Sequence, residues 1–215
     1  MQGGDFEQPR DVPPLGGLMP AIQLALAALS NAHYHQVVLE TVIRDPALFE
    51  VGASASEDDH ARANIRFQAH LRGFFWELTS TLEMLLQHVN DTFRLEVDLV
   101  RSRTVKESLK ALRRAASTHA RAVSAAALLS EAFKAAWCHE VFRYRNSAHL
   151  TFLMVEGLYS AAGESPPLMA LQPAGRGQEQ RFLPQALEHY RTKMLALANE
   201  FAQHGLASRD PNPSA

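Results

Sequence analysis

The sequence predicts an all-α fold, a helical bundle of about five to six helices built around one long central helix. Alanine and leucine are the commonest apolar residues, and both favour helix over strand. Apolar residues recur at steps of three and four along several segments, which is the period of one helix face. Proline and glycine gather mainly between those segments, where the chain must turn.

One core is expected, because a chain of 215 residues with 47% hydrophobic side chains can bury a single sizeable interior. We assign residues 18–206 to one helical-bundle domain. Residues 1–17 combine glycine, proline and acidic residues without periodicity, which predicts a flexible arm. The proline-containing end at 207–215 is predicted to be a disordered tail for the same reason.

The central helix is predicted over Glu57–Phe93. Ser56 is a suitable N-cap, and the acidic residues that follow it suit the positive end of the helix dipole. A helix over Pro20–Ile43 precedes it, because Pro20 fits a first helical turn and Pro46 ends the run. The apolar stripe of the central helix consists of Phe67, Leu71, Phe74, Leu78, Leu82, Leu85 and Val89.

The second half of the chain is also predicted to be helical, without a sheet. A third long helix is expected over His119–Arg145, alanine-rich at first and then aromatic. A buried helix is expected over Leu150–Ala162, which is apolar on nearly every side. Residues 164–180, rich in proline and glycine, should form an exposed loop, and an amphipathic helix over Leu183–Gln203 should close the bundle.

Composition excludes several classes of protein. The net charge of −2 argues against a surface that binds polyanions everywhere but leaves local basic patches open. The single cysteine, Cys138, cannot form an internal disulfide, and no apolar run has the length of a membrane span, so we expect a cytoplasmic protein without a membrane partner. Ten histidines occur without metal-ligand spacing, and no glycine-rich phosphate loop is present, so we expect no metal and no cofactor.

A basic stretch forms one candidate substrate-binding surface. Residues 94–121 carry eight lysines and arginines against three acids. Four of these cations fall on one side of a short predicted helix. A solvated polar face and a nucleic-acid-binding face both explain this pattern. The four candidate substrate-binding residues are Lys106, Lys110, Arg113 and Arg114.

The segment 137–149 is the candidate catalytic site, because cationic, amide and imidazole side chains crowd together there beside bulky apolar ones. Arginine has a planar fork of donors that suits phosphate, and histidine can transfer protons near neutral pH. The alternative is an ordinary helix end, with cations near the negative dipole end and an asparagine in the turn beyond it. The candidate residues are Arg143, Arg145, Asn146 and His149.

Glu77 is a candidate supporting residue for this site. It lies on one flank of the central helix among aromatic neighbours, so its carboxylate is expected to be partly buried. A buried carboxylate requires a cation, and Arg143 or Arg145 would supply one. The alternative is a glutamate at the rim of the bundle that reaches water.

The phrase Phe142-Arg-Tyr-Arg-Asn-Ser-Ala-His149 resembles the motif of the HEPN superfamily of helical bundles. Members that cleave RNA carry an arginine, often followed by a polar residue, with four to six residues between that arginine and a histidine. Arg143 and His149 enclose five residues and meet the spacing. Arg145-Asn146 matches the arginine-polar pair, but only three residues separate Arg145 from His149. The features of the motif are thus divided between the two arginines.

This resemblance implies a metal-independent ribonuclease, commonly a homodimer whose two motifs face one cleft, acting as a toxin or defence component on single-stranded RNA. His149 would serve as general acid or base while an arginine neutralises the phosphorane, and Asn146 would hold the imidazole or the phosphate. RNA, a second copy of the chain and an antitoxin or other protein are the partners it implies. The rival hypothesis is a catalytically silent bundle that binds a protein partner or a nucleotide.

Overall fold

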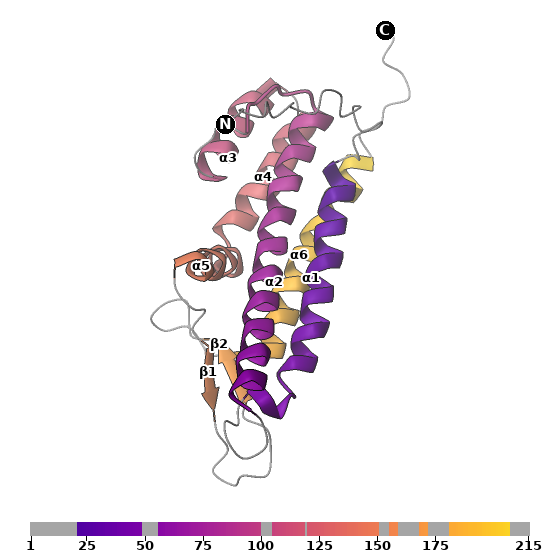
Figure 1. The fold of residues 1–215 in the computed structure, drawn as a ribbon. Helices are drawn as coiled ribbons and strands as arrows, with labels where there is room; N and C mark the ends of the chain where they lie inside the picture. The colour runs from indigo at the N-terminus through magenta and orange to yellow at the C-terminus, as the bar shows by residue number, and fades with distance from the viewer. Residues whose placement is uncertain are drawn as a thin grey trace, which may run out of the picture.

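The computed structural model describes residues 21–48, 56–99, 105–118, 120–150, 155–158, 168–171 and 181–206. Within these residues the chain forms a helical bundle (Figure 1), which confirms the predicted fold class. None of the described helices is both long enough and apolar enough to cross a membrane. The helices are α1 (Ala21–Val42), α2 (Glu57–Thr92), α3 (Val105–Ala115), α4 (Ala120–Lys134), α5 (Ala136–Leu150) and α6 (Leu183–Leu206).

Helix α2 runs the length of the bundle and packs against α1 and α6 on one side and α4 and α5 on the other (Figure 1). Its predicted stripe is fully buried, from Phe67 to Val89, and forms the middle of the core. The helix begins where the sequence predicts, because Ser56 and Asp59 form a capping box: the Asp59 N–H donates to Ser56 Oγ at 3.2 Å. The first and last helices, α1 and α6, are also confirmed.

The chain leaves α2 through a fixed turn that leads toward α3. The Asn90 side chain is buried there and clamps the backbone of Val97, since its Nδ2 donates to Val97 O and its Oδ1 accepts from Val97 N, both at 3.0 Å. Inside this clamp Arg94 and Glu96 adopt positive φ angles of 48° and 54°. Two side-chain bonds thus hold a backbone conformation that non-glycine residues seldom adopt.

The prediction of one long helix over His119–Arg145 is wrong, because the chain bends at Ala135 and forms two helices. The Ala135 carbonyl accepts from the N–H groups of Cys138 and His139 at 3.1 and 3.3 Å and so starts α5 afresh. The sequence contains no proline or glycine here, so local helix propensity does not predict the break. Burial of Cys138, Val141 and Tyr144 in the main core decides the new direction of α5.

The expectation of no sheet is also wrong. Residues predicted as a buried helix contain strand β1 (Val155–Leu158), and the predicted loop at 164–180 contains β2 (Leu168–Leu171). β1 and β2 pair antiparallel, and β2 pairs antiparallel with the short β3 (Arg181–Phe182) in the order β1-β2-β3. A short, evenly apolar run carries no period that separates strand from helix. Apart from Leu150, which ends α5, the rest of these two segments lies outside the described residues, as do the predicted arm and tail.

Candidate functional site

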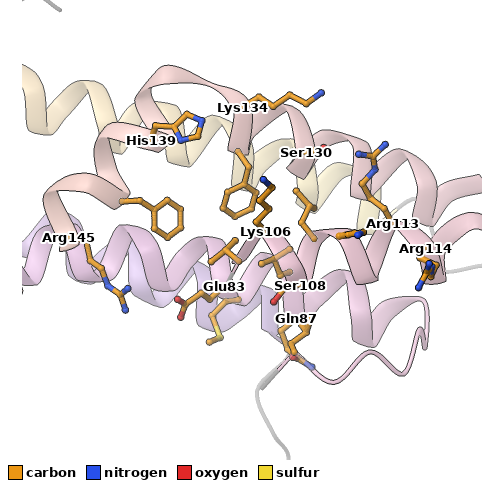
Figure 2. Close-up of a pocket in the computed structure, with 18 of the residues that line it drawn as sticks. Glu83, Gln87, Lys106, Ser108, Arg113, Arg114, Ser130, Lys134, His139 and Arg145 are labelled. Atoms are coloured by element: carbon orange, nitrogen blue, oxygen red, sulfur yellow. The ribbon is translucent and has the colours of Figure 1, made fainter. Parts of the chain in front are cut away.

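A groove of about 1370 Å³ lies between α2, α3, α4 and α5 (Figure 2). It is larger than the roughly 300–1,000 Å³ of a typical small-molecule site. Six cations line it against one acid, Glu83, so we call it the cationic groove. The cations are Lys106, Lys110, Arg113, Arg114, Lys134 and Arg145.

Helix α3 supplies four of these cations, and they are the four that the sequence singled out. The helix is strongly amphipathic: Leu109 and Leu112 are buried in the bundle, and all four cations are exposed. Within the described part of the chain none of the four forms an ion pair. Their positive charge is therefore available to an anion in the groove.

Helix α5 contributes one face to the groove. His139, Phe142 and Asn146 lie at steps of three and four, which places them on one side of the helix beside Arg145. Because α5 continues to Leu150, the alternative that the helix ends at Asn146 is wrong. His149 belongs to the helical backbone one turn beyond Arg145, but its side chain lies outside the described part of the molecule.

The structure separates the two candidate arginines. Two residues of helix rotate the chain by about 200°, so Arg143 and Arg145 occupy nearly opposite sides of α5. Arg145 lines the groove together with Asn146, whereas Arg143 is exposed and is not among the lining residues. The two arginines therefore do not converge on one phosphate in a single chain.

Arg145 has an unusual set of contacts. Its guanidinium carbon lies 4.7 Å from the ring centroid of Trp76, a cation–π contact with a tryptophan that is 44% exposed. Its Nε is buried and has no hydrogen-bond partner among the described residues, where the side chain also makes no ion pair. The indole orients the guanidinium without using its hydrogen-bond donors, so the two terminal amino groups can bind a ligand.

Glu77 is half-buried, as expected, but its described partner is not an arginine. Its Oε1 accepts from Asn31 Nδ2 across the α1–α2 interface at 3.4 Å. The expected ion pair with Arg143 or Arg145 does not occur among the described contacts. Arg145 is held by Trp76 of α2 instead, one residue before Glu77 in the sequence.

A buried polar cluster anchors α5, and no pattern in the sequence indicates it. The Tyr190 hydroxyl of α6 donates to Glu140 Oε2 of α5 at 2.7 Å, and Arg181 Nη1 lies 3.9 Å from the same oxygen. Burial, and next the bond to Glu140, raise the pKa of the Tyr190 phenol. This cluster ties the helix that carries Arg145 to α6 and β3.

Two further features of the structure involve histidines that the sequence did not single out for these positions. His139 lines the groove, and only its spacing from Phe142 and Asn146 on one helix face could have indicated it. Across the α1–α2 interface, His35 Nδ1 and His70 Nδ1 lie 2.9 Å apart, and burial is the main cause that lowers the pKa of each imidazole. That pair depends on the alignment of two helices, which no local pattern encodes.

The described residues contain no cluster of three or more histidine, cysteine, aspartate or glutamate side chains that could hold a metal ion. The residues that line the groove offer anion binding by fixed cations, with the His139 imidazole beside them for proton transfer. No protein-family model, curated protein or solved structure matches the chain. The resemblance to the HEPN superfamily accordingly rests on the residues of the 143–149 segment.

Proposed function

We propose that the protein is an HEPN-like, metal-independent endoribonuclease that binds single-stranded RNA in the cationic groove, as a toxin or defence component. One observation carries the proposal. The basic face of α3 and the Arg145-Asn146 pair are separated by about thirty residues of sequence, and both line the same groove. Each was a candidate from sequence for phosphate recognition on separate grounds.

The charge of the groove supports a ligand with several phosphates. Six cations face one acid in a protein whose net charge is −2, so the positive charge is local. Positive charge gathered in a cleft raises the local concentration of a polyanion and speeds its association. Lysines and arginines that contact the backbone of a nucleic acid supply most of its sequence-independent affinity.

The proposed chemistry uses the groove side of α5. Arg145 neutralises the charge that develops on the phosphorane, and Asn146 holds the phosphate or the imidazole. His149 acts as general acid or base on the ribose hydroxyl or the leaving oxygen. Helical periodicity favours Arg145 over Arg143 as its partner, because four residues of helix bring two positions to one side and six residues do not. A homodimer would bring a second copy of this segment, and an antitoxin would be the natural protein partner.

The test is an RNA-cleavage assay on the full chain in excess chelator. The intact protein should cleave a single-stranded substrate, and His149→Ala should abolish cleavage. Arg145→Ala should lower the rate by about 100- to 1,000-fold, the usual cost of removing one stabilising donor. Arg143→Ala should have a small effect, and His33→Ala, at an exposed position of α1, is the matched control. Cleavage that survives His149→Ala would exclude this site as the catalytic centre.

A second candidate is the catalytically silent bundle that binds a protein partner or a nucleotide, and single-stranded RNA is the nucleotide polymer that tests it. It is favoured by one feature of α5: the two arginines between which the motif is divided lie on nearly opposite sides of the helix, and only Arg145 lines the groove. The two candidates separate in the same assay. If the intact protein binds RNA and never cleaves it, while Arg145→Ala weakens binding, the silent-bundle hypothesis holds.

A further inference from the structure

The inner wall of the cationic groove is aromatic. Phe133 of α4 and Phe142 of α5 both line it, with ring centroids 5.8 Å apart and ring planes tilted by 30°. Both side chains are only half-buried, although each is packed against the main core. Large aromatic surface that is left partly open inside a pocket is a feature of ligand sites.

The rings and the cations belong to one cavity but suit different parts of a ligand. Free phosphate or polyphosphate would use the cations and leave the rings in contact with water. A nucleic-acid duplex would present phosphates, but its bases are stacked on each other and unavailable. A single strand offers both groups, because its charged backbone carries bases whose flat faces are free to stack.

The size of the groove is consistent with such a strand. Its volume of about 1370 Å³ exceeds what one drug-sized molecule fills. Lys106, Lys110 and Arg113 follow one another along a face of α3 at steps of four and three residues, so they form a row beside the aromatic wall. A row of cations can contact successive phosphates of a nucleic-acid backbone on either side of a stacked base.

We propose that an unpaired base of the bound strand stacks on the Phe133–Phe142 pair while its flanking phosphates lie along α3 and against Arg145. This inference rests on the proposed function and adds the means by which the groove selects single strands. Stacking on a phenyl ring accepts any base. The groove therefore selects strands with unpaired bases and does not select a particular base sequence.

The experiment measures fluorescence-anisotropy binding of three labelled probes of equal length: oligoadenylate, an RNA backbone without bases, and a blunt RNA duplex. The His149→Ala chain is used in excess chelator, so that no probe is cut. Oligoadenylate should bind at least about tenfold more tightly than the abasic backbone, because stacking contributes strongly to each bound base. The duplex should also bind more weakly than oligoadenylate.

Phe142→Leu and Phe133→Leu test the rings directly, since leucine keeps the apolar packing and removes the stacking surface. Each should lower the affinity for oligoadenylate by about five- to tenfold and leave the abasic backbone unchanged. Phe182→Leu, on β3 and outside the groove lining, is the matched control. Thermal melts identify any variant that fails to fold. In that case the stacking site is tested by the three-probe comparison alone, on the chain that keeps both phenylalanines.

The two levels of proposal fail in different ways. Equal affinity for oligoadenylate and the abasic backbone would overturn the stacking site while phosphate binding stands. Equal affinity for the duplex and the single strand would overturn the selection of unpaired bases. If none of the three probes binds, the proposed function itself fails and the stacking site fails with it.

Discussion

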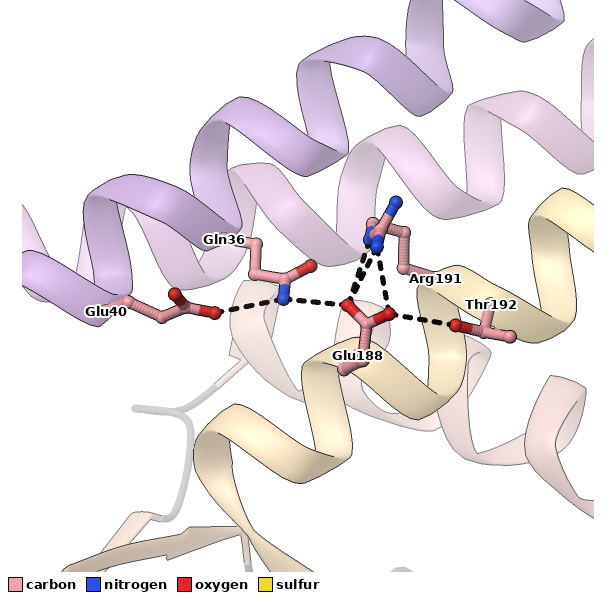
Figure 3. Close-up of polar contacts among 5 residues, drawn as sticks. All are labelled: Gln36, Glu40, Glu188, Arg191 and Thr192. Atoms are coloured by element: carbon pink, nitrogen blue, oxygen red, sulfur yellow. Dashed lines mark hydrogen bonds and ion pairs between the residues drawn. The ribbon is translucent and has the colours of Figure 1, made fainter.

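Two half-buried arginines in this molecule have opposite surroundings. Arg191 of α6 donates to both carboxylate oxygens of Glu188, at 2.8 and 2.9 Å, within a network that includes Gln36 and Thr192 (Figure 3). Arg145 of α5 lies in the cationic groove (Figure 2) with only the face of Trp76 against it among its described contacts. The hydrogen-bond donors of Arg191 are thus occupied by a carboxylate, whereas those of Arg145 have no described partner.

The difference distinguishes a structural ion pair from the proposed binding site. The bidentate bond holds the pKa of Glu188 below its usual range, and the Gln36 amide adds to this effect. A saturated pair of this kind links side chains within the fold and has no capacity for a ligand. A guanidinium that is oriented by a ring but lacks a carboxylate retains its donors, which is what recognition of a phosphate requires. Two of the four predictions that follow test this contrast directly.

The largest effect is expected in α2, which supports both regions. Leu82→Asp should unfold or aggregate the protein, because Leu82 is 0% exposed and an unpaired charge in the core costs several kcal/mol. Circular-dichroism melts measure the change. Gln87→Ala, on the same helix at the edge of the groove, is the control and should melt close to the intact chain. Equal stability of the two variants would show that the core is wrongly assigned.

The contrast itself is tested by two matched changes. Arg191→Ala should lower the free energy of unfolding by about 1 kcal/mol, or about 2–4 °C in Tm, since the pair is partly exposed to solvent. It should leave RNA binding intact. Arg145→Ala should weaken RNA binding by about tenfold or more and change the Tm little. A sharp loss of Tm in Arg145→Ala, without any RNA binding by the intact chain, would make Arg145 a structural anchor.

A smaller effect is expected for the remote cations of the groove. Lys110→Ala should weaken RNA binding mainly at low salt and reduce the slope of log affinity against log salt by about 0.7, the contribution of one phosphate contact. Lys134→Ala is a demanding control, because Lys134 also lines the groove but is paired with Glu131 at 2.8 Å. Equal slopes for both variants would show that pairing does not decide which cations bind.

The smallest effect concerns acid stability at the α1–α2 interface. Burial lowers the pKa of His35, and burial, His35 and Arg66 lower the pKa of His70. The unfolded chain therefore takes up protons first, and stability that is complete above about pH 6.5 should decline as the pH falls below it. His70→Gln removes one titrating ring and should flatten this decline in Tm measured against pH. An unchanged profile would mean that the pair does not control it.

Much of the fold was predictable because long helices carry their signal locally. The boundaries of α2 follow from a cap, an acidic first turn and an uninterrupted stripe. The break at Ala135 was not predictable, since it is imposed by burial of side chains against distant helices. The strands were missed for a related reason: β1 gains its hydrogen bonds from β2, which lies ten residues further along the chain.

The candidate site was predictable in part. The basic face of α3 was recognised because its period is local, and Arg145 and Asn146 were recognised by residue type. The partners of these residues were not, because they depend on how helices align. Arg145 meets Trp76, and Glu77 meets Asn31, through contacts between helices that only the folded chain defines. The same holds for the histidine pair of α1 and α2.

The bend at Ala135 also sets the helical phase of everything that follows it. Arg145 lies ten residues beyond the bend, and each residue of α5 turns the chain by about 100°. Inserting or deleting one residue between Ala135 and Arg145 would leave the composition and charge of α5 almost unchanged. It would nevertheless rotate Arg145 and Asn146 out of the cationic groove. The length of this interval, and not only the identity of its residues, is therefore under constraint in any related chain that keeps the groove.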